Sequence, residues 1–444
     1  MIALGTVFFR TTDFIDSCYI VAFSLLIYGM SGLTGPRTAV RGNKIAAVGM
    51  AVAVAATLLR PGIWSGSGTV ILILVGLAIG TAVGVPAARN VKMTAMPQMV
   101  ALFNGVGGGA VALVAWVEFR HHFGPGYFPE RVEIFELFGA IVGSISFWGS
   151  NIAFGKLQEI LPGRPIKLPG QAQTVVNLAL FVVAVGSAVA LCAGVHSQAL
   201  FIGGILVVSA ILGNMLVLPI GGADMPVVIS LLNAFTGLSA AATGVALSNP
   251  VMIVAGMIVG ASGTILTDQM AKAMNRSVPA IIAGGFGGAV AAPVGGAGET
   301  GGTVRSTSPS DVAIQLSYAR QVVIAPGYGM AVAQAQHAVR ELERALEAKG
   351  VTVKYAIHPV AGRMPGHMNV LLAEADVPYD LLREMDDINP EFGRTDVTLV
   401  IGANDVTNPA AKNEPGSPIY GMPILEVDKS SSVIVLKRSM ASGF

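Results

Sequence analysis

The residues best suited to chemistry form a glycine-rich turn in the last third of the chain. The turn follows a short apolar run at 321–326 and opens a segment, residues 330 to about 349, whose pattern predicts a helix. The first glycine of such a turn allows a tight bend, and the second lets the backbone approach a pyrophosphate at a helix N-terminus. This context therefore indicates a dinucleotide site. The motif is G-x-G-x-x-V, and its members are Gly327, Tyr328, Gly329, Met330, Ala331 and Val332.

The type of dinucleotide is indicated by two strand ends. NAD-specific folds usually carry an acid near the end of the second strand, for the ribose 2′-hydroxyl. The second predicted strand, 351–357, runs into His358 and reaches Arg363 without an acid. The last predicted strand, 433–436, is followed by two cations and a hydroxyl, a set that suits a 2′-phosphate but also suits a solvated strand end. Together the two ends favour NADP over NAD, with Lys437, Arg438 and Ser439 as the phosphate contacts.

A further strand predicts the second half of a doubly wound sheet. Residues 397–401 run into Gly402-Ala-Asn-Asp405, and a glycine with Asx residues at a strand's carboxyl end lies where such sheets bind ligands. The half-sheet is expected to cover 395–427 and to include a strand at 423–427.

Most of the remaining chain has the composition of a membrane protein. The whole chain is 53% apolar and only 12% charged, with mean hydropathy +0.68. The net charge of +1 gives no strong attraction to nucleic acid. Cys18 and Cys192 both lie in apolar stretches, so we expect buried thiols and no metal site.

Nine apolar runs approach the roughly 20 residues that a spanning helix needs. Basic residues in the loops set the topology, because cytoplasmic loops are enriched in them. One side would hold Arg37, Arg41, Lys44, Arg89, Lys92, Lys156, Arg164, Lys167, Lys272 and Arg276, and the other Arg10, Arg60, Arg120 and Arg131. This bias places the C-terminal part in the cytoplasm. The runs are 14–33, 44–59 (the shortest and least certain), 69–85, 96–117, 134–154, 174–195, 200–218, 227–247 and 251–267.

Three polar residues in or beside these runs are candidates for a proton path. Asn104 and Asn233 place amides within spans, where an amide needs several hydrogen-bond partners. Asp224 lies at the expected cytoplasmic mouth of the eighth span. Helix capping or interhelical hydrogen bonding is the alternative role for the two amides.

These observations predict a multi-span α-helical membrane bundle of about nine helices followed by an α/β, Rossmann-like, doubly wound parallel-sheet domain. The membrane domain is expected at 1–275 and the nucleotide domain at 311–444. Between them, 276–310 is rich in Gly, Ala, Pro and Ser, which is typical of a flexible linker.

At the level of longer motifs the chain resembles the proton-translocating nicotinamide nucleotide transhydrogenases, over essentially its whole length. It is similar to a bacterial-type beta subunit, without the NAD(H)-binding domain. The soluble matches are the blocks 327–336 and 357–374, Gly402-Ala-Asn-Asp405 and Lys437-Arg-Ser-Met440. The membrane matches are Met93-Thr-Ala-Met-Pro97, Asp224-Met-Pro226 and Ala273-Met-Asn-Arg-Ser277.

The resemblance implies a reaction, a cofactor and partners. NADP(H) held here would exchange hydride directly with NAD(H) on an alpha subunit, driven by protons entering the cytoplasm, so the protein supplies positioning and exclusion of water. It implies a bacterial inner-membrane complex, active only with its alpha subunit. One alpha polypeptide would add membrane helices, and the whole is expected to be a dimer of heteromers.

The resemblance also assigns residues. The path would involve Asp224 and Asn233, and His358 and Asp405 would sense proton uptake beside the cofactor. Some family members have a histidine where this chain has Asn104, so the titrating group is expected on a helix of another subunit, with Asn104 hydrogen-bonding along the path. Cofactor contacts, beyond the glycine turn, would be His358, Arg363, Pro365, Gly366, His367, Met368, Gly402, Ala403, Asn404, Asp405, Lys437, Arg438 and Ser439.

Two other classes of function fit part of the sequence. A nucleotide-gated channel or transporter with a Rossmann sensor needs discontinuous helices or a carbonyl filter, and no filter-like repeat is seen. A membrane-anchored binding module leaves the intramembrane asparagines unexplained. Hydride exchange with an added NAD(H)-binding domain would separate these alternatives from a transhydrogenase.

Overall fold

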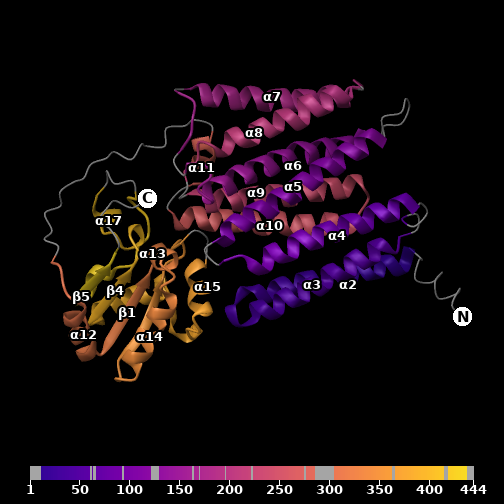
Figure 1. The fold of residues 1–444 in the computed structure, drawn as a ribbon. Coiled ribbons are helices and arrows are strands. Elements are labelled where there is room, and N and C mark those ends of the chain that lie inside the picture. The colour runs from indigo at the N-terminus through magenta and orange to yellow at the C-terminus, as the bar shows by residue number, and fades with distance from the viewer. Residues whose placement is uncertain are drawn as a thin grey trace, which may run out of the picture.

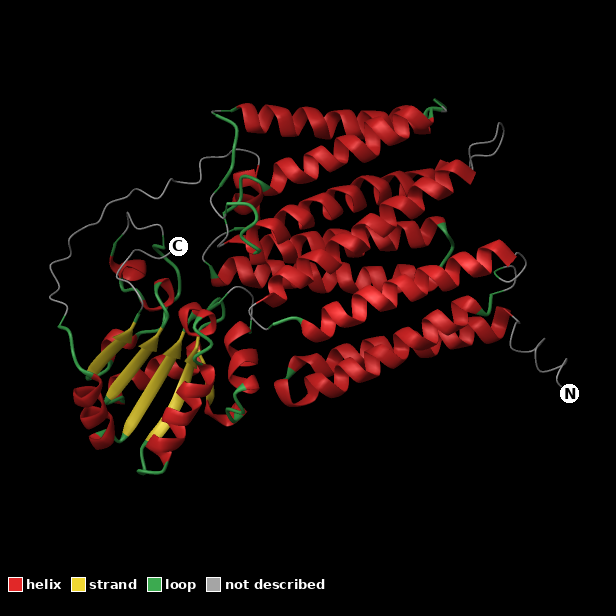
Figure 2. Cartoon of the chain, viewed as in Figure 1, coloured by secondary structure: helices red, strands yellow, loops and turns green. Residues whose placement is uncertain are grey.

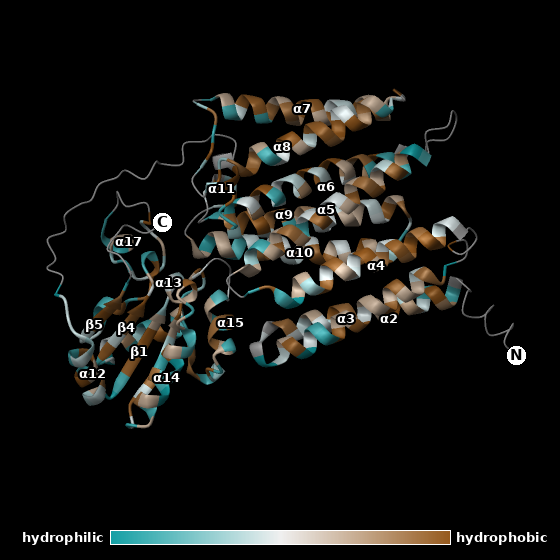
Figure 3. Cartoon of the chain, in the orientation of Figure 1, coloured by the Kyte–Doolittle hydropathy of each residue, from teal (hydrophilic) through white to brown (hydrophobic). Residues whose placement is uncertain are grey.

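The fold has two parts, a bundle of long helices and a lobe built on a parallel sheet, which lies at one end of the bundle (Figure 1). Figure 3 shows many brown, apolar residues along the long helices and more teal, hydrophilic residues in the lobe. The computed structural model describes residues 12–60, 63, 67–92, 95–121, 130–162, 165–169, 171–195, 197–221, 224–274, 277–285, 305–362, 366–414 and 419–437.

Nine helices among these described residues are long and apolar enough to cross a membrane. They confirm the predicted helical membrane bundle. The seventh begins as a π-helix, η3 (Leu200–Val207), which continues as α8 (Val208–Val217). The others are α2 (Thr12–Ser31), α3 (Pro36–Leu58), α4 (Ser67–Asn90), α5 (Met96–His121), α6 (Glu130–Leu157), α7 (Ala172–Cys192), α9 (Met225–Ala246) and α10 (Pro250–Ala273).

The starts of these helices follow from local sequence. Proline lies in the first turn of α3, α9 and α10, where its missing N–H is not needed. Asn249 caps α10 by accepting hydrogen bonds from the backbone N–H groups of Val251 (3.0 Å) and Met252 (3.3 Å). The second span was expected at 44–59 but begins at Pro36, because the polar residues that follow this proline form the first turns of α3.

Glycines allow the backbones of several helix pairs to come into contact. A Cβ built on Gly108 of α5 would lie 2.9 Å from the Gly143 carbonyl oxygen of α6. One built on Gly237 of α9 would lie 2.4 Å from the Gly260 nitrogen of α10. Small residues allow this approach, which gains dispersion contacts where lipid supplies no hydrophobic drive.

The lobe contains a five-stranded, fully parallel sheet in the order β3-β2-β1-β4-β5 (Figure 2). This order confirms the predicted doubly wound, Rossmann-like domain. Its strands are β1 (Gln321–Pro326), β2 (Thr352–Ile357), β3 (Leu382–Glu384), β4 (Val397–Ile401) and β5 (Ser432–Leu436).

Both faces of the sheet are covered, as a parallel sheet requires. Ile324 of β1 packs on one side against α12 (Pro309–Tyr318), α14 (Gln336–Glu347) and α15 (His367–Glu374). The next position along the strand, Val323, faces the opposite core with Phe392 and Leu425. Short helices line that second face: α16 (Met385–Ile388), η6 (Asn389–Arg394), η7 (Asp405–Thr407) and η8 (Val427–Lys429). A further short helix, α17 (Ala410–Asn413), follows η7 in the chain.

Three local expectations differ from the structure. The helix expected from 330 to 349 is divided into α13 (Tyr328–Val332) and α14, with Gln334 between them at φ +51°. The segment 423–427 lies outside the sheet. Within the expected linker, residues 278–285 form a short helix, α11 (Val278–Gly285).

The absence of a strand at 423–427 has a local cause. Pro423 carries no N–H for a ladder. The Asn389 side chain instead donates to the Ile424 carbonyl oxygen (3.1 Å) and accepts from the Glu426 N–H (3.1 Å). The Leu425 N–H donates to the Val406 carbonyl oxygen (2.9 Å). These side-chain and loop partners satisfy the backbone groups, so the segment does not need a neighbouring strand.

Candidate functional site

The glycine turn after β1 is locked to the loop after β4. The Gly327 N–H donates to the Ile401 carbonyl oxygen (2.9 Å), and the Gly329 N–H donates to the Gly402 carbonyl oxygen (2.9 Å). A Cβ on Gly327 would lie 2.3 Å from the Ala403 Cα. The backbone of Gly327 is extended (φ −134°), so this glycine is needed for close approach between two loops rather than for an unusual dihedral angle.

Gly402 provides the opposite half of this contact and does need a special conformation. Its φ is +65°, and a Cβ there would lie 2.4 Å from the Met330 nitrogen. Its own N–H donates to the Leu436 carbonyl oxygen (3.0 Å). The carboxyl ends of β1, β4 and β5 therefore meet at Gly402, which fixes the position of Lys437 beside the β4 loop.

A chain of polar contacts follows from this junction. The Lys437 ammonium donates to Asn404 Oδ1 (2.8 Å), and Asn404 Nδ2 donates to Asp405 Oδ1 (2.9 Å). Burial raises the pKa of Asp405, and the Lys437 charge and the Asn404 hydrogen bond offset this only in part. A carboxyl group with a raised pKa, at the edge of the sheet where ligands bind, can couple proton uptake to binding.

His358, directly after β2, is held in one neutral tautomer. It is 2% exposed. Its Nε2 lies 2.8 Å from the Pro423 carbonyl oxygen, which can only accept, so Nε2 carries the proton. Nδ1 then accepts from the Val360 N–H (3.2 Å). Burial lowers the pKa of His358, and the hydrogen bond to Pro423 only partly opposes this effect.

The remaining described candidates lie on α13 and α15. Tyr328 and His367 face each other with ring centroids 6.3 Å apart. A Cβ on Gly362 (φ +105°) would lie 2.4 Å from His367 Nδ1, so the chain can turn closely around this ring only with glycine. Met368 is buried in the core, whereas the space beside Gly366 (φ +69°) is open. Met368 therefore supports the site from behind.

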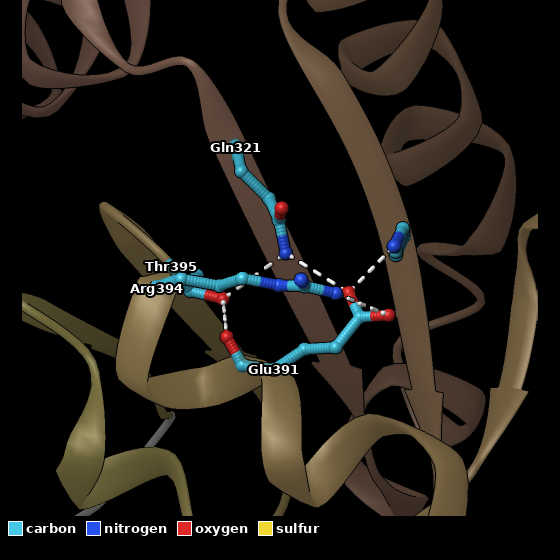
Figure 4. A network of polar contacts seen from close by, with 5 residues as sticks. Gln321, Glu391, Arg394 and Thr395 are labelled. Carbon is cyan, nitrogen blue, oxygen red and sulfur yellow. Dashed lines mark hydrogen bonds and ion pairs between the residues drawn. The ribbon is translucent and has the colours of Figure 1, made fainter.

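The opposite, amino edge of the sheet carries a network of a different kind, shown in Figure 4. Glu391 accepts from Lys354 Nζ (2.5 Å) and Gln321 Nε2 (3.2 Å), and pairs with Arg394 (3.1 Å). Burial raises the pKa of Glu391, but the hydrogen bond and charge of Lys354, with the Arg394 charge, outweigh it and leave the pKa below its ordinary value. These residues tie β1 and β2 to η6, far from the glycine turn, which indicates a stabilising role.

In the bundle, one of the candidate polar residues belongs to a buried cluster. Asn104 of α5 donates to Ser150 Oγ (2.9 Å) and Ser146 Oγ (3.3 Å) of α6. Ser146 Oγ lies 2.5 Å from Thr236 Oγ1 of α9. Asn104 is 8% exposed, and its Oδ1 has no hydrogen-bond partner among the described residues. An acceptor of this kind is suited to a donor from water or from another chain.

Asn233 and Asp224 lie on α9 at increasing distance from this cluster. Asn233 is half-buried and precedes Thr236 by three residues, so it lies on the same side of α9, one turn nearer the helix start. Asp224 precedes the first residue of α9 and lies about 18 Å along the axis from Thr236, at 1.5 Å per residue. The three candidates are therefore spread along the length of α9 and its buried contact with α5 and α6 rather than gathered at one point.

Comparison with known proteins decides the family. The family model described as NAD(P) transhydrogenase beta subunit matches residues 15–444. The chain is 48% identical over 435 residues to the NAD(P) transhydrogenase subunit beta of Rhodospirillum rubrum, covering 96% of this chain and 92% of the relative. The same protein from a named strain of that species matches equally. The chain belongs to the NAD(P) transhydrogenase beta subunit family.

Membership confirms the resemblance seen in the sequence and the class of activity. A transhydrogenase beta subunit is a component of an enzyme complex, and the family implies NADP(H) binding and an alpha subunit as partner. With nine helices able to span a bilayer in the described residues, the chain is a membrane protein. The gated channel or transporter is not favoured by these findings.

Some expected site residues of the transhydrogenase subunit cannot be placed. Arg363, Pro365, Arg438 and Ser439 lie outside the described residues. Within the described residues there is no group of three His, Cys, Asp or Glu side chains that could hold a metal ion.

The contacts of residues 423–427 with the loops after β2 and β4 were not predicted from the sequence. The Pro423 carbonyl oxygen orients His358, and Asn389 holds the residues that follow. The proline within the expected strand at 423–427 was the available signal, because a proline weakens a strand assignment.

Proposed function

We propose that this subunit binds NADP(H) at the carboxyl edge of the lobe's sheet and exchanges hydride with NAD(H) held by the alpha subunit. The observation that carries the proposal is the junction of β1, β4 and β5, where the Gly327 turn, Asn404, Asp405 and Lys437 share one edge. These residues fit the NADP(H) binding that the family implies, because Lys437 supplies a cation for a phosphate. Gly366, in the block 357–374, has open space beside it that a ligand could use.

The strand order refines how the cofactor would lie. His358 follows β2 and Lys437 follows β5, with β1 and β4 between these two strands. A dinucleotide that uses Lys437 for its 2′-phosphate therefore runs across the ends of β1 and β4, over the Gly327 turn. We propose that Arg438 and Ser439 complete this phosphate site, and that Arg363 and Pro365 are further cofactor contacts.

NADP(H), when bound, supplies the hydride chemistry. The protein's own residues position the cofactor and hold protons. The Asn404 amide fixes the separation of the Lys437 and Asp405 charges, so a change of charge at Asp405 alters the field at the phosphate site. His358 presents a neutral ring whose two nitrogens are both hydrogen-bonded, which keeps it uncharged near the site.

We further propose that protons cross the membrane along the Asn104 cluster and α9, toward Asp224 on the cytoplasmic side, and that the lobe itself is cytoplasmic in a bacterial inner membrane. An amide does not take up a proton at physiological pH, so the titrating group comes from a helix of another subunit. The support for this is the unpartnered Oδ1 of Asn104. We expect a dimer of such heteromers, with 276–310 as the segment that permits movement of the lobe.

Lys437→Met tests the NADP(H) site, with Lys349→Met as a matched control at the amino edge of the sheet. Loss of one charge-assisted hydrogen bond costs about 1.5–3 kcal/mol, so the NADPH Kd of the complex is expected to rise roughly 10- to 150-fold. Binding of NADH should not change, and the control should bind as the native protein does. Isothermal titration of both nucleotides measures this, and an unchanged preference for NADPH in Lys437→Met would refute the site.

A further inference from the structure

One cation of the bundle is buried where the others are exposed to water. Lys156, the last residue but one of α6, is only 3% exposed. Lysine is rarely buried to this extent unless a carboxylate pairs with it. The Lys156 ammonium, however, makes no ion pair among the described residues, and its hydrogen bonds go to backbone carbonyl groups. A buried charge of this kind needs an explanation beyond solubility or topology.

The carbonyl partners belong to the turn between α8 and α9. Lys156 Nζ donates to the Leu218 oxygen (2.5 Å) and to the Ile220 oxygen (2.7 Å). Leu218 is the C-cap of α8, where the negative end of the helix dipole attracts a cation. The same turn ends at Asp224, whose N–H donates to the Gly221 carbonyl oxygen (3.1 Å). Lys156 is therefore bound to the turn that carries Asp224.

The surroundings of these contacts are apolar. Leu157, Val217, Ile220 and Met225 belong to one buried hydrophobic cluster, which also contains Ile281 of α11. Hydrocarbon side chains do not stabilise a charge, and two carbonyl groups offset only part of the hydration that an ammonium loses on burial. A neutral side chain would occupy this position at a lower cost, so the charge itself points to a function.

The buried cluster around Asn104 lies on the same helix. Ser150, which accepts a hydrogen bond from Asn104, precedes Lys156 by six residues, or about 9 Å along α6 at 1.5 Å per residue. At an effective dielectric constant of about 20, a unit charge at this distance lowers the occupancy of a second cation roughly 20-fold. Lys156 thus lies where its charge can act on a proton that moves between Asn104 and Asp224.

We infer that the Lys156 charge is an electrostatic barrier at the cytoplasmic end of the proposed proton path, which limits passive leak of protons between the Asn104 cluster and Asp224. The inference rests on the proposed path and adds to it a residue that repels protons. The ammonium neither gives up nor accepts a proton in this role. A purely structural contact between α6 and the turn would instead require the two hydrogen bonds but not the charge.

Lys156→Gln in the assembled complex separates these roles, because an amide can still donate to a carbonyl but is neutral. Lys156→Arg keeps the charge. Lys272→Gln is the control for loss of one cation at the same end of the bundle, because Lys272 is 74% exposed and pairs with Asp268. Each protein is placed in sealed vesicles without nucleotides, and the decay of an imposed pH gradient is followed.

We expect the gradient to decay about tenfold faster with Lys156→Gln than with the native complex, and at the native rate with Lys156→Arg and Lys272→Gln. Potassium efflux from the same vesicles should stay at the native rate, because a general packing defect would let both ions through. Should Lys156→Gln not assemble, Lys156→Met removes the same charge and carries the same expectation.

Three results would overturn the inference. They are a native proton leak in Lys156→Gln, an equal leak in Lys156→Gln and Lys156→Arg, and a leak that persists when Asn104→Leu is added to Lys156→Gln. The last result would mean that the protons do not pass the Asn104 cluster. Unimpaired driven pumping by Asn104→Leu alone would instead refute the proposed path, so the two failures are distinguishable.

Discussion

His358 is a residue whose neutral state is built into its surroundings. Nε2 donates to a carbonyl and Nδ1 accepts from an N–H, so a second proton would displace the Val360 N–H from Nδ1. The folded pKa therefore lies below the unfolded value of about 6.5. As pH falls through about 6.5, the unfolded chain takes up a proton that the native lobe refuses. Stability that is complete above that pH is then lost progressively.

His358→Gln should remove this dependence. The glutamine amide can still donate to the Pro423 carbonyl, but it does not titrate. Hydrogen exchange of β2 amides in the full chain, corrected for intrinsic rates, should show the native lobe losing up to about 1.4 kcal/mol per pH unit below about pH 6.5. His337→Gln, at an exposed position of α14, should behave as the native chain. An unchanged slope in His358→Gln would contradict this assignment.

At the scale of elements, the contact between the β1 and β4 loops depends on two glycines. Gly402→Ala should destabilise the lobe by about 2–4 kcal/mol, from the left-handed conformation plus displacement of the Met330 backbone. Gly393→Ala is the control, because a Cβ there meets nothing within 4 Å. Its effect should stay within about 0.5 kcal/mol. Chemical denaturation measures both, and similar losses in the two variants would argue against the packed junction.

Helix α13 ends in a turn that places Gln334 in the left-handed conformation, a position at which glycine is usual. The Ala335 N–H donates to the Met330 carbonyl oxygen and the Gln334 N–H to the Ala331 carbonyl oxygen, both at 3.1 Å, which is the Schellman pattern. Gln334 is left-handed (φ +51°), where glycine is unstrained.

Gln334→Gly should therefore raise the free energy of unfolding of the lobe by about 0.5–1 kcal/mol. Gln334→Val should lower it, because a β-branched side chain is poorly tolerated at positive φ. Thermal unfolding of the two variants gives the comparison. A destabilised Gln334→Gly protein would show that this turn is not strained.

The sequence predicted elements where one periodicity or one motif decided them. Long apolar runs identified all nine spans, and the strand–turn–helix motif identified β1 and the turn. The sequence-based prediction was wrong where contacts between residues distant in the chain determine the local structure. The segment at 423–427 has a strand-like pattern but pairs with Asn389 and His358, and no local signal reveals the left-handed Gln334. The polar chain from Lys437 to Asp405 likewise requires knowing that β5 lies beside β4.

For the whole molecule, the lobe and the bundle touch through an ion pair between Arg37 of α3 and Asp380, in η5 (Tyr379–Leu381). The side chains are 70% and 78% exposed. A pair this accessible is screened by water and salt and contributes little to stability. It therefore does not fix the lobe in one position, which agrees with the proposed movement of the lobe.

We propose that the lobe's affinity for NADP(H) changes with proton movement across the bilayer. The most direct test is the NADPH Kd of the complete complex in sealed vesicles, with the lobe outside, at constant outer pH and varied inner pH. Coupling between two sites is typically worth about 1–3 kcal/mol, so the NADPH Kd is expected to shift roughly 5- to 150-fold across the inner pH range. A Kd that is the same at every inner pH would contradict it.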